Sequence, residues 1–291
     1  MRLFVRVVER GSFAASASDL GLSRSTATEA LKGLERALGA RLLERTTRHV
    51  APTPDGQDYY RRCLSILAEV DEAEGALKDA QPRGVLRVDA VGLITRTFLL
   101  PRLHEFLDRY PLIELHLGQS DRLVDLVREG VDVVIRAGEP ASSGLILRRL
   151  ALIEEITVAS PAYLAKHGVP QTPDALAQHT MIGFVSSRTG EVMPLELTVD
   201  GQVRSIPVRA RITVDNSDTM AELARLGWGL VQAPRYRFAR DLAEGTLVHV
   251  LPDFPLPPLP LSALYAQNRQ VSRRVRVFLD WLSELFASGE I

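Results

Sequence analysis

Hydroxyl and charged side chains gather in two parts of the sequence, and each part suits a different kind of ligand. Residues 23–36 carry Ser, Thr, Lys and Arg at spacings that place them along one helix. Such groups can bond both phosphate oxygens and the edges of DNA bases. Further along, Ser120, Arg136 and Asn216 each lie near the end of an expected strand. Polar groups at strand ends of an α/β domain typically hold a small ligand.

Composition restricts the class of protein. With 291 residues, of which 46% are apolar and 24% charged, the chain can bury real cores, and two or three compact units are expected. No apolar run approaches ~20 residues, so we expect no membrane span. The opening MRLFVRVVERGSF carries charges through its apolar part, which argues against a signal peptide and for a cytoplasmic protein. A single cysteine excludes an internal disulfide, and we expect neither a metal nor a cofactor.

Residues 11–35, GSFAASASDLGLSRSTATEALKGLE, predict two short helices joined by a turn. Ser12 and Ser23 are each suited to cap a helix N-terminus. Apolar residues recur at three and four positions in both helices, and Gly21 lies in the turn between them. Two helices across such a turn are typical of a helix-turn-helix, whose second helix reads the major groove of DNA.

Positive charge is concentrated at the same end of the chain. Residues 1–62 hold eleven Arg and Lys against seven Asp and Glu, although the whole chain has a net charge of −1. The run RTTR at 45–48 is short, basic and β-branched, which suits a two-stranded wing whose arginines contact DNA. The alternative is that Arg45 and Arg48 are merely solvated.

Residues 53–80 predict a long helix that begins at Thr53-Pro54-Asp55 and ends before QPRG. Apolar residues from Tyr59 to Ala80 mark one face, and nothing in the local sequence covers it. We expect this face to pair with a second copy in the manner of a coiled coil, the alternative being packing on the chain's own body. Cys63 lies in this face, where burial is expected rather than redox sensing.

After Gly84, strands and helices alternate, which predicts parallel sheets covered on both faces. We expect helices over 97–110, with Leu99, Leu100, Leu103, Phe106 and Leu107 inward, and over 121–129 and 217–226. Expected strands include 85–88, 113–117, 131–135, 195–199 and 208–214.

Several ordered segments match one known family. They include FVRVVE at 4–9, GSF at 11–13, RTTR at 45–48 and, more loosely, ASPAYL at 159–164. On these residues the chain resembles the LysR-type transcriptional regulators from end to end. One departure is Ser16, which stands where the family prefers alanine and should fit.

The resemblance implies an N-terminal all-α winged helix-turn-helix with a long linker helix. An α/β two-lobed domain, similar to type 2 periplasmic binding proteins, would follow. The implied units are a DNA-binding domain over 1–52, a linker and dimerisation helix over 53–82, and an effector-binding domain over 83–291, with lobe one over 83–155 and 259–291 and lobe two over 156–258. The implied function is transcription regulation by a homodimer or homotetramer that binds double-stranded DNA, modulated by a small-molecule effector.

The resemblance also points to DNA contacts. Arg24 and Glu29 match positions that face the major groove, whereas Lys32 and Arg36 suit the phosphate backbone. An acid at Glu29, where many relatives are basic, would repel phosphate but could accept a hydrogen bond from a cytosine amine. The candidate contacts are Ser12, Arg24, Ser25, Thr26, Thr28, Glu29, Lys32, Arg36, Arg45, Thr46, Thr47 and Arg48.

Effector contacts are expected beyond the strand ends, near helix N-termini that favour anions. Ser120 is the closest match to the family's ligand-holding hydroxyl, and Leu93 replaces a serine of some members, which favours a less polar ligand edge. Arg136 could pair with a carboxylate or, equally, form a salt bridge within its lobe. The candidate contacts are Gly92, Leu93, Gln119, Ser120, Arg136, Phe184, Val185, Ser186, Asp215 and Asn216, and the expected effector is a carboxylate or an aromatic molecule.

Three rival functions remain open on the sequence. An enzyme would need a catalytic constellation, but the six histidines are scattered and no HExxH, G-x-S-x-G or P-loop occurs. An exported binding protein would need the signal segment that we do not expect. The serious rival is a DNA-binding regulator without a ligand, whose lobes serve only oligomerisation.

Overall fold

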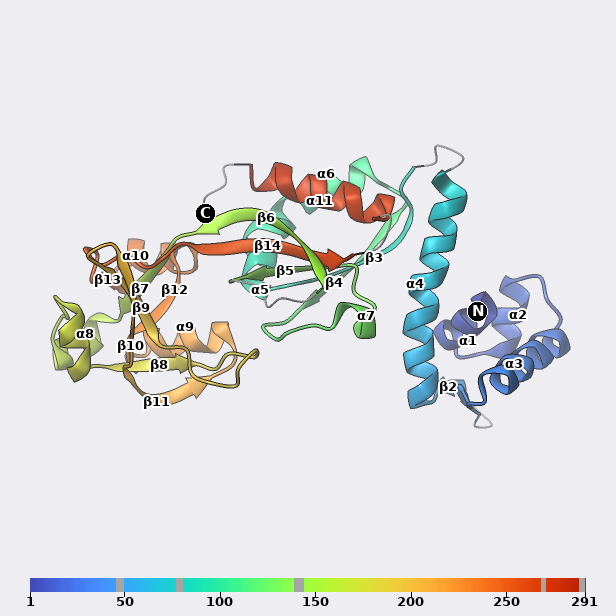
Figure 1. Cartoon of the computed structure of the whole chain (residues 1–291), viewed down its shortest axis with the longest axis horizontal. Coiled ribbons are helices and arrows are strands. Elements are labelled where there is room, and N and C mark those ends of the chain that lie inside the picture. Colours follow the sequence, from blue (N-terminus) through green and yellow to red (C-terminus); the bar gives the residue numbers. More distant parts are fainter. Residues whose placement is uncertain (46–49, 77–80, 139–143, 268–270, 288–290) are drawn as a thin grey trace.

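The computed structural model describes residues 1–45, 50–76, 81–138, 144–267, 271–287 and 291. A helical head, one long helix and a two-lobed α/β domain follow each other along its longest axis (Figure 1). This arrangement confirms the predicted fold class. Among the described residues, no helix has the length and apolar character to span a membrane.

The head combines helices with a short hairpin, namely α1 (Arg2–Arg10), α2 (Phe13–Asp19), α3 (Arg24–Leu38), β1 (Leu43–Arg45) and β2 (Val50–Pro52). Ser12 and Ser23 cap α2 and α3 as predicted, and Gly39 ends α3 in the left-handed conformation, φ +65°. Phe4, Leu31 and other buried apolar side chains from α1, α3 and the approach to β1 form the core. Thr46, Thr47, Arg48 and His49 of the predicted wing lie outside the described residues.

The linker helix α4 (Pro54–Ala76) starts at the predicted Thr53-Pro54 boundary. Thr53 accepts a hydrogen bond from the amide of Gly56 at 2.9 Å and donates one to the carbonyl of Arg41 at 2.6 Å. Gly56 cannot be replaced without movement, because a Cβ there would lie 1.9 Å from the carbonyl oxygen of Leu42. The start of α4 is therefore fixed to the head.

The apolar face of α4 has a cover that the sequence did not reveal. Tyr59, Cys63 and Leu67 pack into the head core, and the Tyr59 ring lies 5.4 Å from that of Phe4 on α1. This part of the face therefore packs on the chain's own body, the alternative that the sequence left open, because α1 folds back onto it. Burial raises the pKa of the Cys63 thiol, which accords with the expected buried residue. Leu77 and Ala80 of this face lie outside the described residues.

Lobe one is built on a sheet with the strand order β4-β3-β5-β14-β6. Its strands are β3 (Gly84–Ala90), β4 (Ile113–Gln119), β5 (Val133–Ala137), β6 (Leu145–Ile153) and β14 (Leu259–Ala266). Strand β3 pairs in parallel with β4 and β5, but β14 pairs antiparallel with β5 and β6. The expected all-parallel sheet is wrong on this side, because β14 returns from lobe two and enters from the opposite end.

Two predicted helices of lobe one differ in the structure. The helix expected over 97–110 begins earlier, as α5 (Gly92–Ile94), a π-helical turn η1 (Thr95–Leu99) and α6 (Leu100–Arg109). Leu99 and Phe106 are buried, but Leu100 is 47% exposed, since it lies off the stripe that faces the sheet. Of the helix expected over 121–129, only α7 (Leu126–Glu129) forms, because polar groups of residues 121 and 122 bind other parts of the molecule. Helix α11 (Arg273–Leu285) adds Phe278 to the core.

Lobe two contains small sheets in the orders β12-β7-β13, β11-β8 and β10-β9. Its elements are β7 (Glu155–Ala159), α8 (Pro161–His167), η2 (Pro173–Gln178), β8 (Thr180–Phe184), β9 (Leu195–Val199), β10 (Gln202–Ile206), β11 (Arg209–Val214), α9 (Ser217–Arg225), β12 (Val231–Pro234), η3 (Arg235–Phe238), α10 (Ala239–Glu244) and β13 (Val248–Val250). Strand β10 was not predicted, although Asp200-Gly201, both at positive φ, is a strong hairpin signal.

The chain crosses between the lobes twice, and the two crossings lie side by side. It leaves lobe one from β6 into β7 and returns after β13 into β14. Ile153 at the end of β6 pairs with Leu259 at the start of β14. Paired crossings of this kind can act as a hinge between the lobes.

Candidate DNA interface and interlobe site

The N-terminus of α3 is fixed by a cluster of hydroxyl groups. The Ser23 hydroxyl accepts a hydrogen bond from the amide of Thr26 at 3.1 Å and lies 2.8 Å from the hydroxyls of both Ser25 and Thr26. All three residues are exposed. The capped end presents hydroxyl groups and the positive pole of the helix to solvent, an arrangement that attracts phosphate.

The outward face of α3 carries the predicted reading residues. Ala27 and Leu31 are buried against the head, whereas Arg24, Glu29 and Lys32 are exposed. The half-buried Thr28 donates its hydroxyl hydrogen to the Arg24 carbonyl at 2.8 Å. The candidates that the sequence placed on this helix are exposed, apart from the half-buried Thr28.

Glu29 is paired with a neighbour on the same helix. Its carboxylate accepts a hydrogen bond from the ammonium of Lys32 at 2.9 Å. That bond, followed by the positive charges of Lys32 and Arg36, lowers the pKa of Glu29. Glu29, which we expected to repel phosphate, is thus partly neutralised by Lys32, which we expected to bind phosphate. Their spacing of three residues on one helix predicts such an ion pair.

Ser12 and Ser16 hold the start of α2, and Ser16 joins it to α1. The Ser12 hydroxyl accepts from the amide of Ala15 at 3.4 Å, and the Ser12 carbonyl accepts from the Ser16 hydroxyl at 2.7 Å. Ser16 is fully buried and also lies 3.0 Å from the Arg6 carbonyl. Serine in place of alanine therefore fits, because its hydroxyl hydrogen is shared between two carbonyl groups.

Glu35 connects the reading helix to the hairpin. Its Oε1 accepts hydrogen bonds from the amides of Leu42 and Leu43 at 2.8 and 3.2 Å. Apart from an acid near the end of α3, nothing in the sequence indicates this role. Arg45 lies in β1, while the rest of the predicted basic wing, Thr46 to Arg48, lies outside the described residues.

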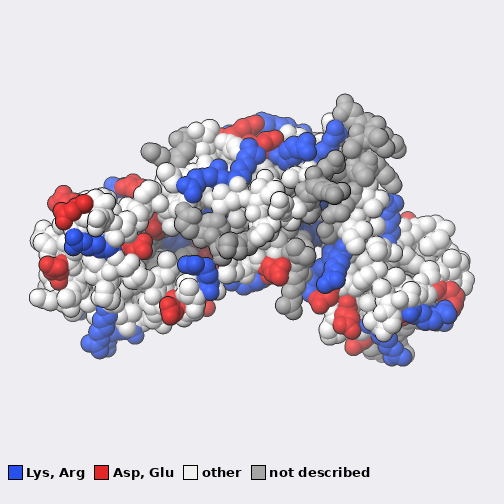
Figure 2. Space-filling model, viewed as in Figure 1, with Lys and Arg blue, Asp and Glu red and all other residues white. Residues whose placement is uncertain are grey.

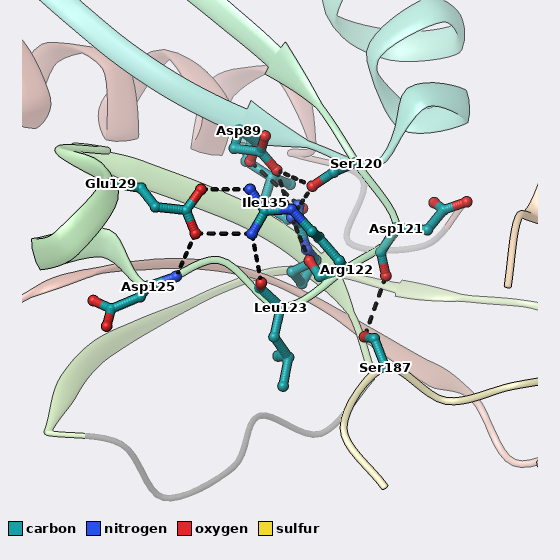
Figure 3. A network of polar contacts seen from close by, with 10 residues as sticks. Asp89, Ser120, Asp121, Arg122, Leu123, Asp125, Glu129, Ile135 and Ser187 are labelled. Carbon is teal, nitrogen blue, oxygen red and sulfur yellow. Dashed lines mark hydrogen bonds and ion pairs between the residues drawn. The ribbon is translucent and has the colours of Figure 1, made fainter. Parts of the chain in front are cut away.

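At the carboxyl ends of β3, β4 and β5, three side chains form a closed polar cluster. Arg136 Nη2 lies 2.5 Å from Asp89 Oδ1 and 3.1 Å from the Ser120 hydroxyl. Ser120 donates to the same Asp89 oxygen at 2.9 Å (Figure 3). The side chains of Asp89 and Arg136 are each only 13% exposed. Of the two interpretations of Arg136, the structure shows the salt bridge within the lobe.

Gln119 and Gly92 of the predicted effector set also lie close together. A Cβ on Gly92 would be 3.1 Å from both Gln119 Oε1 and Arg96 Nη1, so these two side chains approach each other above the glycine. Leu93 follows Gly92 in α5 and is partly buried. A side chain at position 92 would have to displace one of the two polar neighbours.

The lobe-two members of the predicted set share the end of the β11–β8 pair. Phe184 pairs with Val214, and the Val185 amide donates to the Val214 carbonyl at 2.7 Å. Asn216 caps α9 by accepting from the Thr219 amide at 2.9 Å, and Asp215 beside it is exposed. Ser186 accepts from the Arg188 amide at 3.3 Å.

Two polar contacts join the lobes next to these residues. Asp121 Oδ2 accepts from both the amide and the hydroxyl of Ser217 at 3.0 Å, and the Asp121 carbonyl accepts from Ser187 at 3.4 Å. Arg96 of η1 forms an ion pair with Asp218 of α9 at 2.8 Å. Arg237, in lobe two, also pairs with Asp218, at 2.9 Å. Partial burial would raise the pKa of Asp218, but hydrogen bonds from Arg237 and Arg96 bring it below its usual range.

We call this region the interlobe site: the polar cluster at the ends of β3, β4 and β5, residues 91–96, and the start of α9. Sequence reasoning missed its acids Asp89, Asp121 and Asp218. Asp89 could have been found, because an acid between the apolar residues Val88 and Ala90 near the end of a strand needs a partner.

Comparisons with known proteins agree with both parts. A family model described as "Bacterial regulatory helix-turn-helix protein, lysR family" matches residues 1–57, and one described as "LysR substrate binding domain" matches residues 79–287. The chain is a LysR-family transcriptional regulator. Members of this family bind DNA and small-molecule effectors and form oligomers.

Relatives of this LysR-family chain match it over nearly its whole length. The HTH-type transcriptional regulator YhjC of Escherichia coli (strain K12) is 37% identical, covering 97% of this chain and 95% of the relative. The structure of CrgA from Neisseria meningitidis, a LysR-type transcriptional regulator, gives a TM-score of 0.60 at 36% identity, covering 97% and 96%. Full-length AphB, a Vibrio cholerae virulence activator, gives 0.59 at 28% identity, covering 96% of each chain.

Proposed function

We propose that this regulator reads DNA with the outward face of α3 and responds to an effector at the interlobe site. The observation that carries the first half is the capped, exposed end of α3, where Arg24 and Ser25 are exposed while Ala27 and Leu31 are buried. A guanidinium at the start of a reading helix can bond guanine or phosphate, and hydroxyls can reach either. Lys32 and Arg36, further along, would hold the backbone.

Charge on the face shown in Figure 2 supports only a local role for electrostatics. On the face shown in Figure 2, patches of Lys and Arg lie over the two-lobed domain as well as on the head, interleaved with acids. The positive excess of residues 1–62 is therefore not a separate basic pole in this view. Recognition would depend on the placed side chains of α3 and the wing.

We further propose that the chain acts as a homodimer or homotetramer in the cytoplasm, with functional units over 1–52, 53–82 and 83–291. Ile66 and Val70 of α4 are 42% and 41% exposed, and they remain available to a second copy after Tyr59 and Cys63 have been used by the head. Two heads would read half-sites about 34 Å apart.

The class of effector follows from which groups of the interlobe site are already bonded. Asp89 neutralises Arg136 and accepts from the Ser120 hydroxyl, so the cluster does not present an unpaired cation to a ligand. Phe184 and Leu93 add apolar surface in the two lobes. We propose an aromatic effector with a neutral polar group, and a carboxylate is the rival because it could displace Asp89 from Arg136.

The DNA half is tested by selecting binders for the full-length chain from random-sequence duplexes. We expect an enriched sequence with two related half-sites, bound at least about 10³-fold more tightly than unrelated DNA. Enrichment of no sequence, or of a single unpaired site, would contradict the proposal.

The effector half is tested by thermal shift with benzamide and benzoate, two rings of similar shape that differ in charge. We expect benzamide, but not benzoate, to raise the melting temperature. A larger effect of benzoate would favour the carboxylate class. The contrary result is that a wider panel of aromatics and carboxylates leaves both the melting temperature and the DNA footprint unchanged. That result would favour a DNA-binding regulator without a ligand. The internal bonding of the interlobe acids supports this second candidate.

A further inference from the structure

Residues 120–130, which we call the relay segment, contact three parts of the molecule that are otherwise far apart in sequence. The segment begins at the Ser120 hydroxyl of the polar cluster and ends at Gly130, after the short helix α7. Most of residues 121–125 is neither strand nor helix. Its shape is therefore set by the contacts that its polar groups make.

The first contact is with lobe two. Asp121 binds the backbone N–H and the hydroxyl of Ser217, the first residue of the nine-residue helix α9. A carboxylate at this end of a helix is also attracted by the helix dipole. Ser187, in the loop after β8, donates to the Asp121 carbonyl at 3.4 Å. Any movement of lobe two relative to lobe one must stretch or break these bonds.

The second contact closes the segment on itself and on the polar cluster (Figure 3). The carbonyl of Arg122 accepts from Arg136 at 3.0 Å, so the guanidinium that holds Asp89 also holds the segment. The guanidinium of Arg122 binds both oxygens of Glu129, at 2.8 and 2.5 Å. Glu129 also accepts from the Asp125 amide at 3.1 Å. Bidentate pairing of this kind fixes direction as well as distance.

The third contact is with the linker helix. Helix α7 packs against α4, as Figure 1 shows. A Cβ on Gly130, whose φ is +66°, would lie 3.9 Å from both Cβ and the carbonyl oxygen of Arg61, so α4 passes this glycine at van der Waals distance. Hydrogen bonding to Arg122 is the main cause that lowers the pKa of Glu129, and the charge of Arg61 contributes further.

We propose that the relay segment couples the position of lobe two to the linker helix, with Asp121 at the input and α7 at the output. A change in lobe position would pull on Asp121, shift Arg122 and Glu129 together, and move α7 against α4. This coupling rests on the proposed function in one respect: effector binding is taken as the natural cause of lobe movement. The coupling itself needs neither effector nor DNA.

Hydrogen exchange of the full-length chain, followed by mass spectrometry, tests the coupling directly. Asp121→Ala removes both bonds to Ser217, and we expect about tenfold faster exchange at the start of α9 and also in α4 peptides over 57–67. The matched control is Asp218→Ala, which breaks a neighbouring interlobe pair without touching the relay segment. It should speed exchange near α9 but leave α4 unchanged.

A second variant tests the output end and covers the case in which Asp121→Ala fails to fold by circular dichroism. Glu129→Gln weakens the bond between Arg122 and α7. We expect faster hydrogen exchange in α4 and unchanged exchange in α9. The coupling is overturned if neither variant alters α4, or if Asp218→Ala alters α4 as much as Asp121→Ala does. Because no DNA or effector is added, failure of the proposed function would leave this result unaffected.

Discussion

The outward face of α3 and the interlobe site are both polar, but they use their polar groups in opposite ways. On α3, the guanidinium of Arg24 has no hydrogen-bond partner among the described residues and points to solvent. At the interlobe site, Arg136 binds Asp89, Ser120 and the Arg122 carbonyl, and Asp121 binds Ser217. The guanidinium of Arg24 is therefore available to a ligand, whereas Arg136 and Asp121 already bind groups of the protein.

This difference has an energetic consequence. A ligand of α3 gains each new contact at the cost of displaced water, so contacts there raise affinity and specificity. A ligand at the interlobe site has to exchange its contacts for internal ones, so its net affinity is smaller and its effect on the conformation larger. We therefore expect the head to determine which DNA is bound and the interlobe site to determine how it is bound.

The largest expected effect measures how much the Asp89–Arg136 pair contributes to stability. Asp89→Asn leaves Arg136 buried beside a neutral partner, and we expect the free energy of unfolding in urea to fall by about 3–5 kcal/mol. The control is Asp280→Asn, which breaks the exposed pair with Arg148 and should cost less than about 1 kcal/mol. Equal costs for the two variants would mean that the interlobe cluster is no stronger than a surface pair.

A second prediction concerns Glu155, at the crossing into lobe two. Its carboxyl group has no hydrogen-bond or ion-pair partner among the described residues, and burial, with the charge of Glu196, raises its pKa from 4.5 to about 7. Between these values the unfolded chain ionises while the folded chain stays protonated. The free energy of unfolding should therefore fall as the pH rises from 4.5 to 7, by at most about 3 kcal/mol.

Glu155→Gln should remove this dependence and stabilise the chain at pH 8. Urea unfolding at pH 5, 6, 7 and 8 measures it, with the exposed Glu154→Gln as the matched control. Comparison with the wild type cancels the titration of His179 and His249, whose pKa values burial lowers. Identical pH profiles for wild type and Glu155→Gln would show that this acid is solvated and ionised at neutral pH.

A third prediction concerns Arg24 on α3. Arg24→Ala should lower affinity for the selected DNA by about 1–3 kcal/mol and relax one base preference, with no change in stability. Fluorescence anisotropy with the selected duplex and its single-base variants measures both. An unchanged footprint and affinity would remove Arg24 from the reading face.

The smallest expected effect is at Glu29, which is paired with Lys32 on α3. Glu29→Gln releases Lys32 from its ion pair, so Lys32 can contact phosphate, and the slope of log affinity against log salt should steepen by about one. A base preference at one position should change in the same variant if Glu29 accepts from cytosine. An unaltered slope and preference would place both residues away from DNA.

Local features of the fold could be predicted from the sequence, and long-range ones could not. The caps Ser12 and Ser23 and the Thr53-Pro54 helix start depend on neighbouring residues only, and the structure confirms them. The turn Asp200-Gly201 was just as local and was overlooked. The cover of α4 by α1 depends on a fold-back that no periodicity in residues 53–80 encodes.

The candidate sites divide in the same way. The buried stripe of α3, Ala27 and Leu31, follows from helical spacing. The partners of Arg136 depend on the order β4-β3-β5, which places Asp89 beside an arginine 47 residues away. The helix expected over 121–129 is mostly absent for a similar reason, since Asp121 is bound by a helix of the other lobe.

We propose that the head selects the DNA sequence while the interlobe site controls the geometry of the bound DNA. The most direct measurement determines, for full-length Arg24→Ala and Asp121→Ala, both the base preference and the bend of the selected DNA. We predict that Arg24→Ala changes the base preference but not the bend, and that Asp121→Ala changes the bend but not the base preference. A change of base preference in Asp121→Ala, or of neither quantity in both variants, would contradict the claim.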